Sequence, residues 1–173
     1  NFGGSSEEER IYYRVAEDDE VVISGSESVK ETGYTWEFNE TYKQWKLVLP
    51  KAFFGDFNPF KKLIRQDQYI DVDESSQGWG WLMYGRSKHR GNVYLNGLGF
   101  SERGSIQALT DAHTWHAEVS PEERFTVIWA NFGDKDPNQE NVEINARPFA
   151  FAPTKSGLSY ISIKGFTIKN IAS

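Results

Sequence analysis

Aromatic side chains are the most frequent residues in this sequence that could hold a sugar ring. They make up 15% of 173 residues, with 6 Trp, 8 Tyr and 12 Phe. Flat amphipathic rings suit both hydrophobic cores and the apolar faces of sugars. Trp45 and Trp129 stand in alternating segments and are predicted core residues. Trp79, Trp81 and Tyr84 lie among glycines, where they favour a surface contact or the anchoring of a loop.

Acidic residues could do hydrolytic chemistry if two of them faced each other. The densest cluster is Asp71, Asp73 and Glu74. Glycosidases need two carboxyl groups about 5 to 9 Å apart, a separation that spacing in sequence does not give. A solvated turn is the preferred interpretation, and no carboxylate is predicted to be catalytic.

A calcium loop is suggested by Asp134, Asp136 and Asn138, which alternate as calcium ligands do. However, Gln139 stands where the loop needs Gly, and Asn145 stands where it needs Glu. A hairpin loop with Asx turns, between strands ending at 131 and starting at 142, is the better prediction.

Other catalytic and metal-binding patterns are missing from the sequence. His113 and His116 would lie on opposite faces of a strand, and His89 is the third histidine. The chain has no Cys, no Gly-x-Ser-x-Gly elbow and no glycine-rich phosphate loop. We therefore predict no metal and no cofactor.

The charge balance disfavours nucleic acid as a partner. There are 25 acidic against 19 basic residues, a net charge of -6, which would repel phosphates. The short basic run over 86–90 is typical of a solvated turn. No apolar stretch approaches the roughly 20 residues of a membrane span, so no membrane contact is predicted, and the compartment stays open.

Short apolar runs separated by Gly, Pro, Asn and Asp predict an all-β fold with an antiparallel β-sandwich. Brief helical turns are expected over 59–64 and 106–109. Strands are predicted over 11–15, 21–24, 35–38, 45–49, 68–72, 81–84, 93–95, 114–119, 125–131, 142–146, 149–152, 160–164 and 166–170.

The segments 11–24 and 160–170 each hold two short strands joined by a tight turn, as rungs of a solenoid do. The sequence thus predicts a sandwich inserted between rungs of a truncated parallel β-helix. The expected boundaries are 1–27 for the first partial rungs, 28–157 for the sandwich and 158–173 for the last rung. Because the chain starts at Asn and stops after a strand pattern, we expect it to be a piece of a longer protein.

Several motifs, in order, resemble glycoside hydrolase family 120 β-xylosidases, which are right-handed parallel β-helix proteins. They span most of the chain, from about 11 to 166. They are Val-Val-Ile-Ser-Gly-Ser-Glu (21–27), Phe-Phe-Gly-Asp-Phe-Asn-Pro-Phe (53–60), Asn-Val-Tyr-Leu-Asn-Gly (92–97), Trp-Ala-Asn-Phe (129–132), Asp-Pro-Asn (136–138), Val-Glu-Ile-Asn-Ala-Arg (142–147) and Tyr-Ile-Ser-Ile-Lys-Gly-Phe (160–166).

The resemblance implies a β-sandwich that interrupts early rungs, with the catalytic carboxylates on later rungs that this chain lacks. It also implies four substrate-binding candidates. Tyr69 stands where the family has a Trp that lines a sugar subsite. His89 matches a His-x-Gly element in which Arg90 replaces the usual Thr. Asp56 and Asn58 lie in the best-matched motif, where Asx turns would also explain them.

Two functions of different kind remain at this point. The first is a non-catalytic sandwich of a glycoside hydrolase that acts on xylosides or similar plant polysaccharide fragments, lining the sugar cleft and helping subunits to associate as a homo-oligomer. The alternative is a free-standing carbohydrate-binding or structural interaction module. Only a binding module should hold xylo-oligosaccharides without the rest of the parent protein.

Overall fold

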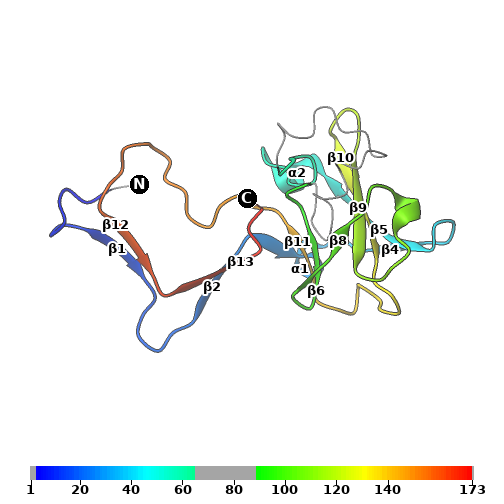
Figure 1. The fold of residues 1–173 in the computed structure, drawn as a ribbon, viewed down its shortest axis with the longest axis horizontal. Helices are drawn as coiled ribbons and strands as arrows, with labels where there is room; N and C mark the ends of the chain where they lie inside the picture. Colours follow the sequence, from blue (N-terminus) through cyan, green and yellow to red (C-terminus); the bar gives the residue numbers. More distant parts are fainter. Residues whose placement is uncertain (1–2, 65–88, 173) are drawn as a thin grey trace, which may run out of the picture.

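The computed structural model describes residues 3–64 and 89–172 of the chain. Almost all of its elements are strands, and they form two facing sheets together with two parallel strand pairs from the chain ends (Figure 1). The prediction of an all-β chain is confirmed for these residues.

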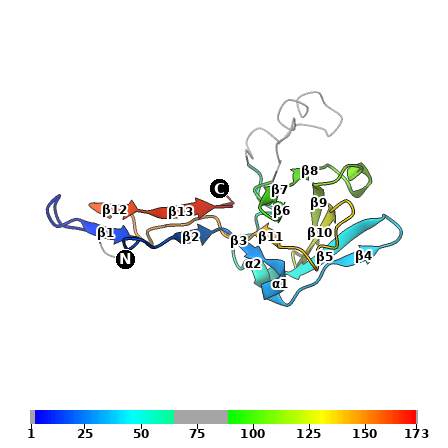
Figure 2. The same cartoon turned by 90° about the horizontal axis from the view of Figure 1, so that it is seen from below.

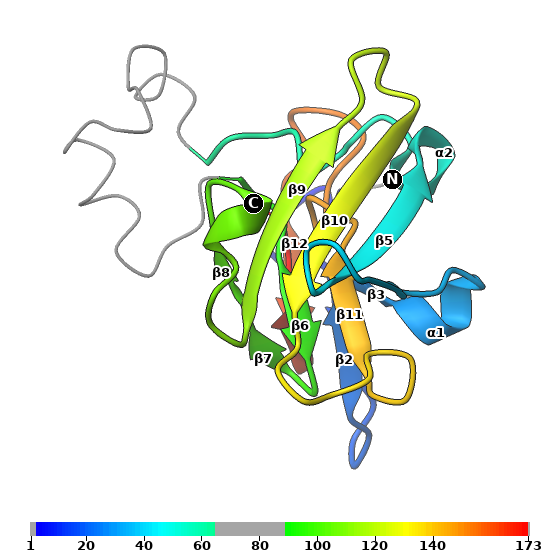
Figure 3. The same ribbon diagram turned by 90° about the vertical axis from the view of Figure 1, so that its right-hand side faces the viewer.

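The larger sheet has five strands in the order β4-β5-β10-β9-β8. All neighbours are antiparallel except β8 and β9. Figure 3 looks onto this sheet, with β6 and β11 of the other sheet behind it. The strands are β4 (Glu37–Asn39), β5 (Gln44–Pro50), β8 (Ser101–Glu102), β9 (Thr114–Val119) and β10 (Phe125–Asn131).

The smaller sheet has four antiparallel strands in the order β3-β11-β6-β7. Apolar side chains from both sheets meet between them, as alternation along half-buried strands requires. The strands are β3 (Ser26–Ser28), β6 (Val93–Leu95), β7 (Leu98–Gly99) and β11 (Val142–Asn145). The fully buried centre of the core includes Leu47, Leu49, Val93, Trp115, Ile128 and Ile144.

The two ends of the chain pair with each other in parallel. Strand β1 (Ile11–Arg14) pairs with β12 (Ile161–Lys164), and β2 (Val21–Ser24) pairs with β13 (Phe166–Lys169). Figure 2 shows these pairs extending to one side of the sandwich. Several of their large apolar side chains face solvent, among them Tyr12 at 62% and Ile168 at 50% exposure.

Helical structure among the described residues is brief. It consists of α1 (Val29–Thr32), α2 (Lys51–Phe54) and the 3-10 turn η2 (Ile106–Ala108), so the turn expected over 106–109 is confirmed. Over 59–64 no helix forms; the Asn58 carbonyl accepts from the amides of Lys61 and Lys62 and the turn ends there. None of the described helices is long and apolar enough to span a membrane.

One sequence prediction about aromatic residues is wrong, and the structure refines another. No strand forms over 149–152, because Phe149 and Phe151 find no neighbouring ladder; Phe151 instead packs its ring 5.3 Å from that of Phe166. Trp129 is buried as predicted, but it lies on the outer face of the larger sheet, where its ring packs 5.3 Å from that of Tyr42. Trp45, in contrast, packs against the core as predicted.

Candidate functional site

Asn58 holds the turn that follows α2 against the larger sheet. Its side-chain amide donates to the Thr126 hydroxyl at 2.8 Å, and its carbonyl oxygen accepts from the Phe60 amide at 3.0 Å. The second contact is an Asx turn of the kind expected from the sequence. Both ends of the side chain therefore serve the fold.

Asp56 lies two residues earlier and points its carboxylate to solvent. Within the described parts of the chain it makes no hydrogen bond or ion pair. It lines a hollow of about 200 Å³, whose other lining residues are Lys51, Gly55, Asn58, Lys61, Lys62 and Glu123. Charged and amide groups of this kind can hydrogen-bond to hydroxyl groups of a ligand.

Glu123 is an acidic residue of this hollow that forms an ion pair. It pairs with the Lys61 ammonium group. The hydrogen bond and charge of Lys61 lower the pKa of Glu123, with smaller contributions from Lys51 and Lys62. The hollow thus places the Glu123 carboxylate, whose pKa is lowered, beside the side chains of Lys51, Lys61 and Lys62.

The segment after Asn58 lies beside the segment that begins at His89. The Gly91 amide donates to the Pro59 carbonyl at 3.0 Å, and the Arg90 amide donates to the Lys62 carbonyl at 2.8 Å. The structure therefore brings Asp56 and Asn58 to the same end of the sandwich as His89, which comes 31 positions after Asn58 in the sequence.

His89 is fixed by a buried carboxylate. Its ring Nδ1 lies 2.5 Å from Glu102 Oε1, and its backbone amide donates to Glu102 Oε2 at 2.9 Å. Glu102 is only 6% exposed, on the edge strand β8. With Nδ1 engaged, the imidazole presents Nε2 as its second polar atom.

No feature of the sequence singles out Glu102. It stands between Ser101 and Arg103 in a stretch that is typical of an exposed loop. Its importance comes from β8, a strand of two residues that exists only because it pairs in parallel with β9. An acidic residue at such an edge is ordinarily solvated, so no local signal would have found it.

The remaining residues and loops that the sequence analysis singled out do not join this site in the described part of the chain. Tyr69, Trp79, Trp81 and Tyr84, with the acidic cluster at 71–74, lie outside the described residues. The sequence predicts that the loop between residues 131 and 142 is a hairpin loop. In the structure this loop instead connects β10 of the larger sheet to β11 of the smaller sheet. It does contain the expected Asx turn, since Asp136 accepts from the amide of Asn138 at 2.9 Å. Among the described residues, no group of three metal-ligating side chains comes together.

A family model described as "Glycoside hydrolase 120, insertion domain" matches residues 34–114 and 107–144. The chain belongs to glycoside hydrolase family 120. A solved structure described as "The complex structure of XylC with xylose" is similar over 100% of this chain, with 34% sequence identity and a TM-score of 0.82. Among curated proteins no match was found.

The family 120 chain spans 28% of the length of that solved structure. The matched segments of the family model run from β4 to β11 and so cover most of the two sheets. The structural match also includes the paired end strands, because it covers the whole chain.

Proposed function

We propose that this chain is the non-catalytic β-sandwich portion of a glycoside hydrolase that acts on xylosides, where it lines the sugar cleft. The observation that carries the proposal is the whole-chain similarity, at 34% identity, to a structure described as a complex of XylC with xylose. The sugar of that complex belongs to XylC, and its transfer to this protein is part of the proposal.

In the proposed arrangement the sandwich, residues 28–157, interrupts a right-handed parallel β-helix to which 1–27 and 158–173 contribute. Two features support this. The end strands pair in parallel, in register over four residues in each pair. Their apolar side chains, such as Ile163 and Ile168, are half exposed, as the outer rungs of an unfinished stack would be.

The proposed sugar contacts are Tyr69, His89, Asp56 and Asn58. His89 is the best-prepared of the described residues because Glu102 fixes its ring while the side chain keeps 20% of its surface exposed. Asp56 lines a hollow with a carboxylate that bonds to none of the described residues. Asn58 is a weaker contact because its amide already serves Thr126 and Phe60.

The test uses both the chain and the longer protein that contains it. The longer protein should hydrolyse an aryl β-xyloside, and the chain alone should not. Calorimetry of the chain alone with xylo-oligosaccharides should show no binding, since the cleft also needs the β-helix. Clear binding by the chain alone would favour a free-standing carbohydrate-binding module instead.

His89→Ala in the longer protein tests the cleft contact. Loss of one hydrogen bond to substrate should raise KM with little change in kcat. Lys43→Ala is a suitable control, because Lys43 is exposed in the turn between β4 and β5 and pairs with the neighbouring Glu40. An unchanged KM in His89→Ala would contradict the role of His89.

A further inference from the structure

The sandwich and the paired end strands meet in a short seam of backbone hydrogen bonds around Gly25. The Gly25 carbonyl accepts from the amides of Ala146 at 2.8 Å and Arg147 at 2.9 Å, and the Gly25 amide donates to the Lys169 carbonyl at 3.0 Å. The Ala172 amide donates to the Arg147 carbonyl at 3.0 Å. Three separate passages of the chain are thus tied together where the two parts join.

Ser26 is the centre of the side-chain contacts in this seam. Its hydroxyl donates to Glu143 Oε1 at 3.1 Å and accepts from Asn170 Nδ2 at 3.1 Å. The Ser24 hydroxyl lies 2.8 Å from the Ser26 hydroxyl. It is the donor of this hydrogen bond, because the single hydroxyl proton of Ser26 is already donated to Glu143. Each hydrogen-bonding position of Ser26 is therefore used.

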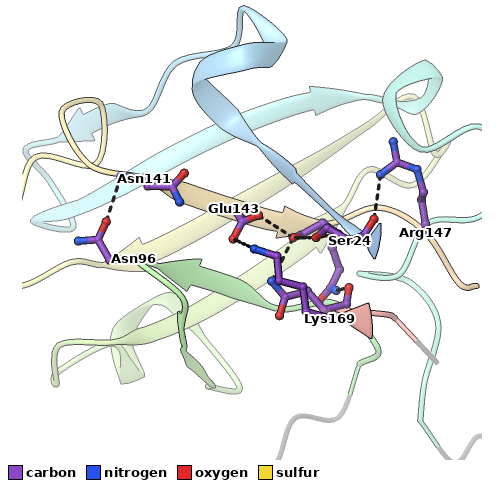
Figure 4. Close-up of polar contacts among 9 residues, drawn as sticks. Ser24, Asn96, Asn141, Glu143, Arg147 and Lys169 are labelled. Atoms are coloured by element: carbon purple, nitrogen blue, oxygen red, sulfur yellow. Dashed lines mark hydrogen bonds and ion pairs between the residues drawn. The ribbon is translucent and has the colours of Figure 1, made fainter. Parts of the chain in front are cut away.

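Asn145 and Glu143 extend the seam into the sandwich. The Asn145 amide donates to the Asn170 carbonyl at 2.6 Å, and Glu143 Oε2 lies 3.5 Å from the ammonium group of Lys169 on β13 (Figure 4). Asn145 is 1% and Glu143 8% exposed. Both contacts join a strand of the sandwich to the last segment of the end strands.

A buried network of this kind favours one geometry. Burying a carboxylate and an amide costs free energy unless each polar atom keeps its partner, and tilting the sandwich would separate them. An apolar contact would tolerate a range of angles at smaller cost. The joint is also tightly packed, because a Cβ on Gly25 would come within 2.4 Å of the Asn170 carbonyl oxygen.

The similarity to XylC agrees with a fixed joint. A TM-score of 0.82 over 100% of the chain includes both the sandwich and the end strands in one superposition. A different angle between the two parts would lower this score, since both contribute to it. The score therefore agrees with a similar orientation in two proteins that are 34% identical.

We infer that Ser26, Glu143, Asn145 and Asn170 are positioning residues that hold the sandwich in one orientation on the paired end strands. The consequence for turnover rests on the proposed function: the network would fix where the end of the sandwich that carries His89 and Asp56 lies relative to the sugar cleft. None of these four residues needs to touch the sugar.

The first experiment measures the orientation in the chain itself. The sequence has no Cys, so spin labels can be placed at Glu17→Cys, in the turn between β1 and β2, and at Thr41→Cys, in the turn between β4 and β5. We expect a narrow distance distribution in the parent sequence. The variant Asn170→Gly combined with Ser26→Ala should broaden it.

The choice of substitution provides a matched control. Asn170 has a φ of 53°, which Gly adopts readily, so Asn170→Gly removes the side chain without straining the backbone. Asn96 has a φ of 51° and bonds Glu140 and Asn141 away from the seam. Asn96→Gly should therefore leave the distribution narrow.

Two results would overturn the inference. One is a broad distribution already present in the unaltered sequence, which would mean that no orientation is fixed. The other is an equally narrow distribution in the seam variant, which would mean that other contacts fix it. Both outcomes are independent of any enzymatic activity.

The second experiment measures kinetics in the longer protein with an aryl β-xyloside. Asn170→Gly with Ser26→Ala should raise KM about tenfold and leave kcat within about twofold, because a displaced cleft wall weakens binding and spares the chemistry. Asn96→Gly should change neither. If the longer protein has no xylosidase activity, the proposed function fails while the distance measurement still decides the positioning role.

Discussion

The His89 ring and the Glu102 carboxylate are joined by a contact of 2.5 Å at the edge of the larger sheet. The same carboxylate accepts the His89 backbone amide at 2.9 Å, so Glu102 holds both the main chain and the side chain of one residue. This double contact sets the direction in which the imidazole points. It also offsets part of the cost of burying an acidic side chain on a two-residue strand.

Glu102→Ala should lower the free energy of unfolding by about 1 to 3 kcal/mol, because the His89 amide and Nδ1 lose their buried partner. Urea denaturation followed by Trp fluorescence measures the change. Glu118→Ala is the control: Glu118 is 59% exposed and lies 3.5 Å from His116. It should change stability by less than about 0.5 kcal/mol. Equal effects of the two substitutions would contradict a structural role for the His89–Glu102 pair.

Substitution of Asn58 should destabilise the chain more than substitution of Asp56. Asn58→Ala removes the bonds to Thr126 and Phe60 and should cost about 1 to 2 kcal/mol. Asp56→Ala, in the same turn, removes an exposed carboxylate that pairs with none of the described residues, and the change should stay within about 0.5 kcal/mol. Urea denaturation of the two variants side by side is the measurement. A destabilised Asp56→Ala would mean that its carboxylate supports the turn rather than faces a ligand.

Gly91 is predicted to be intolerant of any side chain. A Cβ there would lie 2.6 Å from the ring of Phe60, which is fully buried. Gly91→Ala should therefore destabilise the chain by about 1 to 3 kcal/mol through overpacking. Phe60→Leu makes room at the same place. The double variant should lose about 1 kcal/mol less stability than the sum of the losses in the two single variants. Additive losses would show that the ring and the glycine are not coupled.

The long strands of the sandwich were predictable from the sequence. The predicted range 125–131 coincides with β10, and 114–119 coincides with β9. In β9 the apolar residues Trp115, Ala117 and Val119 stand at every second position, whereas β10 is a run of apolar residues from Val127 to Ala130. Both patterns are local properties of the sequence that indicate a strand. The parallel end strands were also found, since each repeats a short apolar run after a tight turn.

The short strands were not predictable, because their partners create them. Strand β3 is Ser-Glu-Ser and β8 is Ser-Glu, neither of which has any β propensity to signal a strand. Over 149–152 the opposite holds, because alternating Phe and Ala predict a strand but form no ladder in the structure. The same limit applies to the site: the Asx turn of Asn58 follows from its type, while the burial of Glu102 depends on strand β9, its distant neighbour.

Tyr94 should make stability fall in alkaline solution. It lies on β6 with its hydroxyl donating to Asn145 at 3.4 Å, beside the polar seam. Burial raises the pKa of Tyr94 above its ordinary value of 10.0; the charge of Glu143 adds to this, and hydrogen bonds with Asn145 and Asn92 oppose it. In the unfolded chain the phenol ionises more readily than in the folded one. The contribution of Tyr94 to stability is therefore complete below pH 10.0 and is lost as the pH rises through the raised folded pKa.

Tyr94→Phe should remove this part of the pH dependence, although it also removes the bond to Asn145 and so lowers stability at neutral pH. Urea denaturation at a series of pH values from neutral to alkaline separates the two effects, because the lost bond shifts the whole curve and the lost ionisation flattens it. Tyr42→Phe is the matched control, since Tyr42 lies on the outer face of the sandwich and is 42% exposed. If Tyr94→Phe kept the full alkaline slope, the loss of stability would have to come from other groups, and burial of the Tyr94 phenol would not be its cause.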